Sequence, residues 1–379
     1  MTEKMARKRD FKLHNLSTLA GASLRVFLGA LRQGRIAPRY YFNVLLTGLI
    51  VLVATPFRWY EYWLFHGRLR RFKMAEPPLF ILGHWRSGTT FLHNVLCQDP
   101  RAGFLTTYQS LFPENLGSQW LFKSFMRAVM PEKRPSDNVK LAVDFPQEDE
   151  FAVGNMFPMA YYYFFYFPDQ YARFYQEFAR LQVRPARRRR WQHTYQRLLA
   201  KALLNTQRPR AVFKNPVNTV RLPILREMYP EARFIYLYRN PIVVYLSTKK
   251  FFLSLFPTLQ FQPTSEAQIV ALILDVFAKM YRDYEADKAR LQPESLLEIS
   301  FEEFEKDPLG HLQMIYERLQ LPDFEQARPF FEAYIRSQES YEKNRYQIKK
   351  TELEQIQIQW AEILEAWGYS LPSNLEVID

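Results

Sequence analysis

The residues best suited to chemistry lie in a short polar segment between two apolar ones. Segment 79–96 reads LFILGHWRSGTTFLHNVL, in which the apolar run 79–82 stops at Gly83 and apolar residues resume at helical spacing from Phe91. This pattern predicts a buried strand, a tight loop and the start of a helix. Such a loop directs backbone N–H groups and the positive end of a helix dipole toward an anion. The segment therefore predicts a phosphate site.

The side chains of this loop suit the same ligand. Ser87, Thr89 and Thr90 offer hydroxyl donors around Gly88, and Arg86 adds a permanent positive charge. The two glycines have the spacing of the nucleotide-triphosphate loop G-x-x-x-x-G-K-[ST], but Thr89 stands where that loop requires lysine. The missing lysine argues against a kinase or an ATPase. An ordinary strand–turn–helix with a polar turn is the alternative interpretation.

A second strand end carries further candidates for anion binding. Residues 233–248 read RFIYLYRNPIVVYLST, in which 234–238 suits a buried strand and a helix is expected to begin near Pro241. Arg239 directly follows the strand, and Ser247 lies eight residues later. An arginine fork suits a phosphate dianion, and a serine hydroxyl can close the site. Taken alone, an arginine after a strand is usually a surface residue.

Together, these two motifs resemble those of the sulfotransferase family, and in particular its bacterial and lipid-type branch. The loop is similar to the family's R/K-x-G-T-T loop, which binds the 5′-phosphosulfate of the sulfate donor PAPS (3′-phosphoadenosine 5′-phosphosulfate). In that family a strand-ending arginine and a serine eight residues later hold the 3′-phosphate. The resemblance implies PAPS as donor and adenosine 3′,5′-bisphosphate as product. It places residues 86–90, Arg239 and Ser247 at the donor.

A third segment concerns catalysis. Residues 211–216 read AVFKNP and predict a short strand that ends at Lys214. In cytosolic small-molecule sulfotransferases the comparable strand is followed by a histidine that acts as general base, but Pro216 stands here. Lys214 could still contact the bridging oxygen or the transferred sulfonyl group, where charge develops in the transition state. The base has to come from elsewhere in the chain.

The candidate base lies in the acidic segment 144–151, DFPQEDEF. Glu148, Asp149 and Glu150 are consecutive, and crowded carboxylates raise one another's pKa values toward the range of a useful general base. A helix N-terminus is the expected setting, because negative charge is favoured there, and a solvated helix start is the alternative. The segment also resembles one in bacterial and lipid-type sulfotransferases. Only one or two of the three can face the site, and Glu148 is preferred.

The remaining candidates are weaker. Lys343, Asn344 and Arg345 occupy the region where sulfotransferases close a basic loop over the 3′-phosphate, so the resemblance implies donor contacts from Asn344 and Arg345. A surface loop is the alternative, because the R-K-G and G-x-x-G-x-W-K patterns of the cytosolic enzymes are absent. His84 flanks the phosphate loop and could contact donor or acceptor. Neither the histidines nor Cys97, the only cysteine, have metal-ligand spacing, so no metal is expected.

The bulk composition limits the classes of function. A chain of 379 residues with 48% hydrophobic and 16% aromatic residues can bury a large core. The formal charge of +12 fits a nucleic acid, a polyanionic cofactor or an anionic membrane surface, but no zinc-finger, helix-turn-helix or RNP pattern supports nucleic acid. One cysteine excludes a disulfide framework and fits a reducing, cytoplasmic compartment.

The N-terminal segment 1–75 is basic and hydrophobic and is expected to be helical. Residues 40–57 contain no charged residue, and Trp59 and Trp63 follow in an aromatic belt. Three interpretations are open: an interfacial or re-entrant membrane anchor, a buried helix that lines an acceptor pocket, and a true membrane span. Basic residues before position 40 favour the cytoplasmic face of the membrane. The expected location is therefore the cytoplasm, with peripheral or anchored contact to a membrane.

Residues 76–379 are expected to form the catalytic domain. Strands at 79–83, 211–214, 233–238 and 295–300 alternate with helices, which indicates an α/β fold with a doubly wound parallel sheet and flanking helices. Open sheets of this kind bind ligands at the carboxyl ends of their strands, where the two phosphate motifs lie. The resemblance implies the P-loop-like fold of sulfotransferases.

The acceptor is inferred from apolar segments. Residues 161–167 are seven consecutive aromatic residues, which predict either a buried cluster or part of an acceptor pocket. Together with the apolar N-terminal segment they favour a lipophilic alcohol, such as a sterol, another steroid or a lipid. A glycan or glycolipid hydroxyl is the alternative within the family. A P-loop nucleotide kinase and a non-enzymatic basic membrane-binding protein are the alternatives outside it. The sequence does not indicate the oligomeric state.

Overall fold

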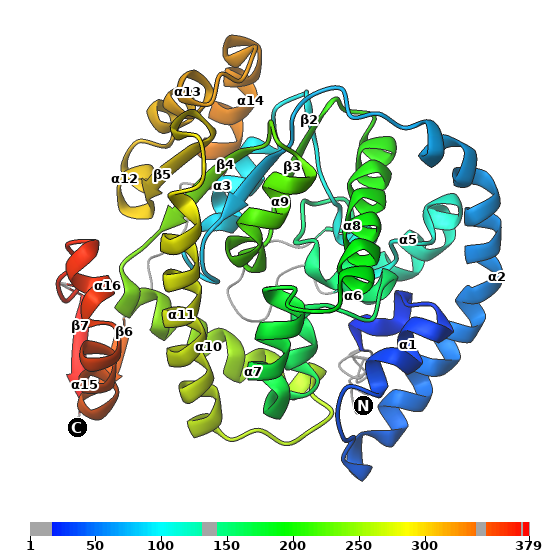
Figure 1. The fold of residues 1–379 in the computed structure, drawn as a ribbon, viewed down its shortest axis with the longest axis horizontal. Coiled ribbons are helices and arrows are strands. Elements are labelled where there is room, and N and C mark those ends of the chain that lie inside the picture. Colours follow the sequence, from blue (N-terminus) through cyan, green and yellow to red (C-terminus); the bar gives the residue numbers. More distant parts are fainter. Residues whose placement is uncertain (1–16, 131–141, 339–345, 373, 379) are drawn as a thin grey trace, which may run out of the picture.

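The computed structural model describes residues 17–130, 142–338, 346–372 and 374–378. These residues fold around a five-stranded parallel sheet that is covered by helices (Figure 1). In order across the sheet, the strands are β2 (Ala102–Gly103), β3 (Arg210–Lys214), β1 (Leu79–Leu82), β4 (Arg233–Tyr238) and β5 (Leu296–Ser300). The predicted parallel α/β sheet is confirmed, and only the short β2 was not expected.

Alternate residues of the central strands face two separate cores. Phe80 and Leu82 of β1 belong to the larger apolar cluster, whereas Leu79 and Ile81 belong to a smaller one. Successive side chains of a strand point to opposite faces of a sheet, so both faces of β1 are buried. Burial on both faces explains why the strand reads as an unbroken apolar run rather than an alternating one.

Helices cover both faces of the sheet, which is the doubly wound arrangement. Those packed in the smaller core are α3 (Thr89–Leu96), α12 (Phe301–Lys306), α13 (Pro308–Arg318) and α14 (Phe324–Arg336). Those packed in the larger core are α1 (Leu24–Leu31), α6 (Glu150–Met156), α7 (Tyr171–Phe174), α8 (Pro185–Thr206), α9 (Leu222–Met228), α10 (Pro241–Leu259), α11 (Glu266–Lys288), α15 (Lys350–Gln359) and α16 (Ala361–Ala366).

Two local signals fix the start of α10, which follows the second phosphate motif. Asn240 caps the helix, because its side-chain oxygen accepts a hydrogen bond of 3.0 Å from the backbone N–H of Ile242. Pro241 occupies the first helical position, where a missing N–H costs nothing. The expected helix start near Pro241 is confirmed, and it holds Arg239 at the end of β4.

The aromatic run 161–167 lies in the larger core. Each of its seven side chains is at most 2% exposed. Phe164 and Phe165 pack against Phe252 and Phe256 of α10, with ring centroids 5.4 to 5.9 Å apart. The structure therefore gives the run the role of a buried cluster, because large aromatic side chains contribute most of the apolar area in a core.

The predicted N-terminal hydrophobic helix is present as α2 (Tyr41–Arg71), which packs with α4 (Thr107–Leu111) and α5 (Gln119–Val129). Two described helices, 38–71 and 241–259, are long and apolar enough to cross a membrane. Half of the most apolar window in 241–259 is buried, as in a core helix, but only 17% of that in 38–71. The interpretation of this segment as a buried helix is therefore wrong for most of its apolar side chains.

The C-terminal part adds a second, smaller sheet that the sequence pattern did not predict. Its two parallel strands are β6 (Tyr346–Lys349) and β7 (Leu375–Ile378). The strand β6 is linked directly to α15, whose buried Leu353 and Ile356 belong to the larger core. This small sheet therefore joins the C-terminal end of the chain to the main domain.

Candidate active site

The predicted phosphate loop joins β1 to α3 at the carboxyl end of the sheet. Gly83 and Gly88 have φ angles of 134° and 93°, which side chains other than hydrogen rarely allow. A Cβ at Gly83 would lie 2.4 Å from the carbonyl oxygen of Leu237 in β4, and a Cβ at Gly88 would lie 2.0 Å from the Phe301 ring. Both glycines are therefore needed for the loop to pass between its neighbours.

Hydrogen bonds hold the loop in this shape. The N–H of Gly83 donates to the Thr219 hydroxyl at 2.9 Å, and the Ser87 hydroxyl donates to the His84 carbonyl at 2.9 Å. Thr89 and Thr90 begin α3, whose first N–H groups have no partner within the helix. The loop thus offers backbone donors and the positive end of α3 to an anion, as predicted.

The second phosphate motif lies beside this loop. The side chain of Arg86 donates to the Ser247 hydroxyl of α10 at 2.9 Å, and Arg239 lies 3.5 Å from the Arg86 carbonyl oxygen. The guanidinium of Arg239 also stacks over the Phe301 ring, 4.5 Å from its centroid. The structure therefore brings together the arginines and the serine that the sequence assigned to the two ends of one anionic ligand.

Lys214 and Glu148 meet on another side of the loop. The Lys214 ammonium forms an ion pair with one carboxylate oxygen of Glu148 and lies 3.4 Å from the Thr90 hydroxyl. The Tyr162 hydroxyl donates to the other carboxylate oxygen of Glu148, and the Trp85 indole donates to the Tyr162 oxygen at 2.9 Å. Glu148 remains 18% exposed, so a hydroxyl group can reach it.

The other two carboxylates of the acidic run turn away from the loop. Asp149 accepts hydrogen bonds from the Tyr195 hydroxyl at 2.6 Å and from the Asn215 amide. Glu150 accepts a bidentate pair from Arg221 at 2.6 and 2.9 Å and a further bond of 2.8 Å from Asn215. Both carboxylates are fully buried. Among the three residues of the run, Glu148 is the one paired with Lys214, which in turn lies 3.4 Å from the Thr90 hydroxyl of the phosphate loop.

The raised pKa that was expected in the acidic run is found at Asp149. Burial raises the pKa of Asp149 to about 7, and the neighbouring charge of Glu150 contributes less than burial does. The crowding argument therefore expected a raised pKa in this segment but attributed it mainly to the wrong cause. Because Asp149 has no access to solvent, its raised pKa bears on folding rather than on proton transfer from an acceptor.

Three residues of this network were missed from the sequence. Asn215 directly follows Lys214, and it contacts both buried carboxylates. The only sequence signal for Asn215 was its place at the end of a strand that carries a candidate catalytic residue. The sequence placed Tyr162 in an aromatic run and Trp85 in the phosphate loop. Only the fold shows that both support Glu148.

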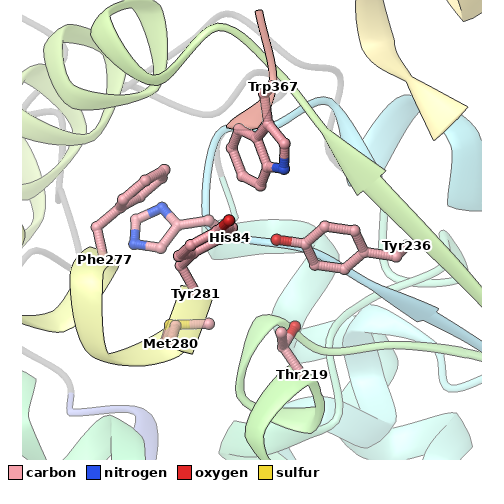
Figure 2. A pocket seen from close by; sticks show the side chains of 7 residues that line it. All are labelled: His84, Thr219, Tyr236, Phe277, Met280, Tyr281 and Trp367. Carbon is pink, nitrogen blue, oxygen red and sulfur yellow. The ribbon is translucent and has the colours of Figure 1, made fainter. Parts of the chain in front are cut away.

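His84 occupies a different position from the one expected. Its imidazole faces a small cavity between β4 and α11, where its ring centroid lies 4.7 Å from that of Phe277 (Figure 2). The cavity measures about 10 Å³, which is enough for about one water molecule and not for an acceptor. Burial lowers the pKa of His84 to about 3, so its imidazole is neutral at physiological pH. The His84 side chain therefore packs between the loop and α11.

Two predicted donor contacts, Asn344 and Arg345, lie outside the described residues. Within the described part of the chain, no group of three or more histidine, cysteine, aspartate or glutamate side chains could hold a metal ion. The site thus consists of a phosphate loop, two arginines, one serine and the network around Glu148.

Comparison with known proteins identifies relatives over almost the whole chain. The model of the sulfotransferase family matches residues 77–326. Over 354 residues the chain is 30% identical to the omega-hydroxy-beta-dihydromenaquinone-9 sulfotransferases Stf3 of Mycobacterium bovis and Mycobacterium tuberculosis, which covers 92% of this chain and 90% of each relative.

Two solved structures have the same fold. The sulfotransferase STF9 from Mycobacterium avium matches with a TM-score of 0.66 and 19% identity, over 93% of this chain and 98% of that one. The sulfotransferase STF1 from Mycobacterium tuberculosis matches with a TM-score of 0.54 and 18% identity, over 82% of this chain and 85% of that one.

Proposed function

This chain belongs to the sulfotransferase family, and on that premise we propose that it transfers the sulfonyl group of PAPS to a hydroxyl group of a lipid-type alcohol. The products would be a sulfate ester and adenosine 3′,5′-bisphosphate. The observation that carries the proposal is the contact of Lys214 with both Glu148 and Thr90 at the phosphate loop. Sulfonyl transfer to a hydroxyl group needs a base for the hydroxyl proton and a cation for the leaving oxygen, and this contact places one of each side by side.

The groups around the loop fit the donor. PAPS carries anionic groups at two positions, and the loop is surrounded by two arginines, several hydroxyl groups and backbone donors. Residues 86–90 would hold the 5′-phosphosulfate, and Arg239 and Ser247 would hold the 3′-phosphate. When bound, PAPS supplies the sulfonyl group, and sulfotransferases generally use this donor.

The chain's own residues then provide the proton transfer and the charge stabilisation. Glu148 takes the proton of the acceptor hydroxyl as its oxygen forms a bond to sulfur and the bond from sulfur to the phosphate oxygen breaks. Lys214 exchanges its contact with Glu148 for the phosphate oxygen on which negative charge develops. Tyr162, held by Trp85, keeps the Glu148 carboxylate in position. This division of roles needs no histidine after β3.

The relatives and the surface support the proposed acceptor class. The mycobacterial relatives are named for an omega-hydroxylated dihydromenaquinone, which is a long apolar molecule with a terminal hydroxyl group. The outer side of α2 exposes many apolar side chains, which is consistent with a substrate that resides in a lipid phase. We therefore propose a lipid alcohol of this kind, and sterols and steroids belong to the same screen.

A direct test incubates the full chain with PAPS and separate acceptors and detects sulfate esters by mass spectrometry. The acceptors are an omega-hydroxylated isoprenoid quinone, a sterol and a glycolipid. The proposal predicts a sulfate ester of the isoprenoid alcohol or the sterol. Sulfation of the glycolipid alone would overturn the acceptor class, and binding of ATP as tight as that of adenosine 3′,5′-bisphosphate would overturn the donor.

A further inference from the structure

The helix α2 has the reverse of the polarity expected for a surface helix. Thr47, Arg58 and Glu61 are among its few buried side chains. Six of its exposed side chains are large and apolar and recur at helical spacing: Phe42, Leu45, Leu49, Leu52, Trp59 and Trp63, each between 52% and 78% exposed. We call these six residues the outer face of α2. A helix in water normally turns such a stripe toward the core, so this face calls for an apolar partner.

Buried charges fix the orientation of α2 on the domain. Glu61 forms an ion pair of 2.6 Å with Lys201 of α8 and accepts a hydrogen bond of 2.6 Å from the backbone N–H of Gly117. Lys201 also pairs with Glu114 at 3.3 Å, and Lys201 and Glu61 are at most 2% exposed. Rotation or departure of α2 would break the pair of Glu61 with Lys201 and leave the buried Lys201 with one carboxylate instead of two. These contacts turn the outer face of α2 away from the domain.

Arginines lie at both ends of the outer face. Arg32, Arg35 and Arg39 precede α2, Arg68, Arg70 and Arg71 end it, and all six are exposed. The one acidic residue in 24–75 is Glu61, which is buried. If a second copy of the chain packed its α2 against this one, arginines would face arginines whether the two helices ran parallel or antiparallel. Such like-charge contacts are repulsive. Anionic lipid headgroups complement the same pattern.

The neighbouring helix α5 extends the apolar surface. Trp120 is 71% exposed, and Leu121 and Phe125 are also exposed. Phe57 of α2 and Phe122 of α5 pack edge to face with ring centroids 5.3 Å apart, so the two helices lie side by side (Figure 1). The exposed tryptophans suit the boundary between headgroups and acyl chains, where an amphipathic ring is most stable.

We propose that the outer face of α2 docks this protein on an anionic lipid bilayer, with the helix lying in the plane of the interface. The apolar side chains enter the acyl boundary, and the arginines at the helix ends contact anionic headgroups. The docking stands on α2 alone and does not require sulfonyl transfer. If both proposals hold, the enzyme works where a lipid alcohol resides.

The test measures flotation of the full chain with vesicles of phosphatidylglycerol and phosphatidylcholine, and with phosphatidylcholine alone. The combined variant Leu45→Gln, Leu49→Gln, Leu52→Gln is compared with Ile358→Gln, a 79% exposed residue of α15 on the opposite side of the molecule (Figure 1). We expect at least about a tenfold loss of vesicle binding in the triple variant and none in Ile358→Gln. Thermal melting checks that both variants fold.

A second variant tests the charges. Arg68→Gln, Arg70→Gln, Arg71→Gln is expected to weaken binding to the anionic vesicles and to reduce its salt dependence. Equal vesicle binding by wild type and the leucine variant would overturn the proposal. So would a wild type that stays unbound and sediments as a dimer that the leucine variant dissociates, because the outer face would then bind a second copy. Neither result depends on whether the donor site binds its ligand.

Discussion

Glu148 and Lys214 form an ion pair although 66 residues separate them in the sequence. The contact joins the segment before α6 to the carboxyl end of β3, next to the phosphate loop. Asn215, the next residue, donates to both Asp149 and Glu150. Two consecutive residues at the end of β3, Lys214 and Asn215, therefore contact all three carboxylates of the acidic run, and Glu148 is the only one of the three that is not fully buried.

The lysine of this pair is expected to act on the rate. Replacement by Lys214→Met removes the charge that would stabilise the leaving phosphate oxygen, so kcat should fall roughly 100- to 1,000-fold. Lys279→Met, which removes a surface lysine paired with Asp275, is the control and should keep wild-type kcat. Initial rates of sulfate-ester formation at saturating PAPS measure kcat in both variants. An undiminished kcat in Lys214→Met would remove this residue from the mechanism.

The tyrosine that supports Glu148 has a matched neighbour. Tyr162→Phe removes the hydroxyl that donates to Glu148, whereas Tyr163→Phe removes an equally buried hydroxyl that donates to the Gly154 carbonyl at 2.8 Å. We expect kcat to fall on the order of tenfold in Tyr162→Phe, with unchanged affinity for adenosine 3′,5′-bisphosphate, because only the position of the base changes. Similar losses in both variants would indicate a general effect on packing.

The second phosphate motif is expected to recognise the 3′-phosphate. Arg239→Ala should weaken the binding of adenosine 3′,5′-bisphosphate roughly 10- to 100-fold, because it removes a hydrogen bond between charged groups. The affinity for AMP, which lacks the 3′-phosphate, should not change. Titration calorimetry with both nucleotides measures the two effects, and equal losses for both would show that Arg239 does not read the 3′ position.

The buried pair of Glu150 and Arg221 is expected to stabilise the fold. Arg221→Met strands the Glu150 carboxylate, so the free energy of unfolding should fall by about 3 to 5 kcal/mol. The surface pair of Arg188 and Glu227 provides the control, and Arg188→Met should cost less than about 1 kcal/mol. Denaturant unfolding compares the two variants, and a similar small loss in both would mean that Glu150 finds other donors.

The buried carboxyl of Asp149 makes stability depend on pH. Its pKa rises from 3.8 in the unfolded chain to about 7 in the folded protein, so between these values the folded state keeps a proton that the unfolded state loses. Stability from this group is present below pH 3.8 and is lost as the pH rises to 7. Relative to Asp149→Asn, wild type should lose about 3 kcal/mol of unfolding free energy between pH 5 and pH 8. A constant difference would contradict the raised pKa.

Sequence patterns were sufficient for the parts of the fold whose signals are local. The run at Leu79–Leu82 is apolar at every position because both of its faces are buried, so it could be recognised as a strand. The start of α10 follows from Asn240 and Pro241, which act within one turn. The strand β6, by contrast, has one buried residue in four and gave no periodic signal.

The rest of the site depends on contacts between distant segments. Glu148 contacts Lys214 and Tyr162, and only the fold decides that its two neighbours turn inward instead. Likewise, the uncharged stretch in α2 is plain in the sequence, but the direction of its apolar side is not. The buried pair of Glu61 and Lys201 sets that direction.

The most direct test of the proposed chemistry replaces the base. Glu148→Gln keeps the size of the side chain and its contact with Tyr162 but cannot take a proton. We expect the rate of sulfate-ester formation from PAPS and a lipid alcohol to fall at least about 100-fold, with binding of adenosine 3′,5′-bisphosphate retained. A variant that sulfates the acceptor at the wild-type rate would contradict the assignment of Glu148 as the base.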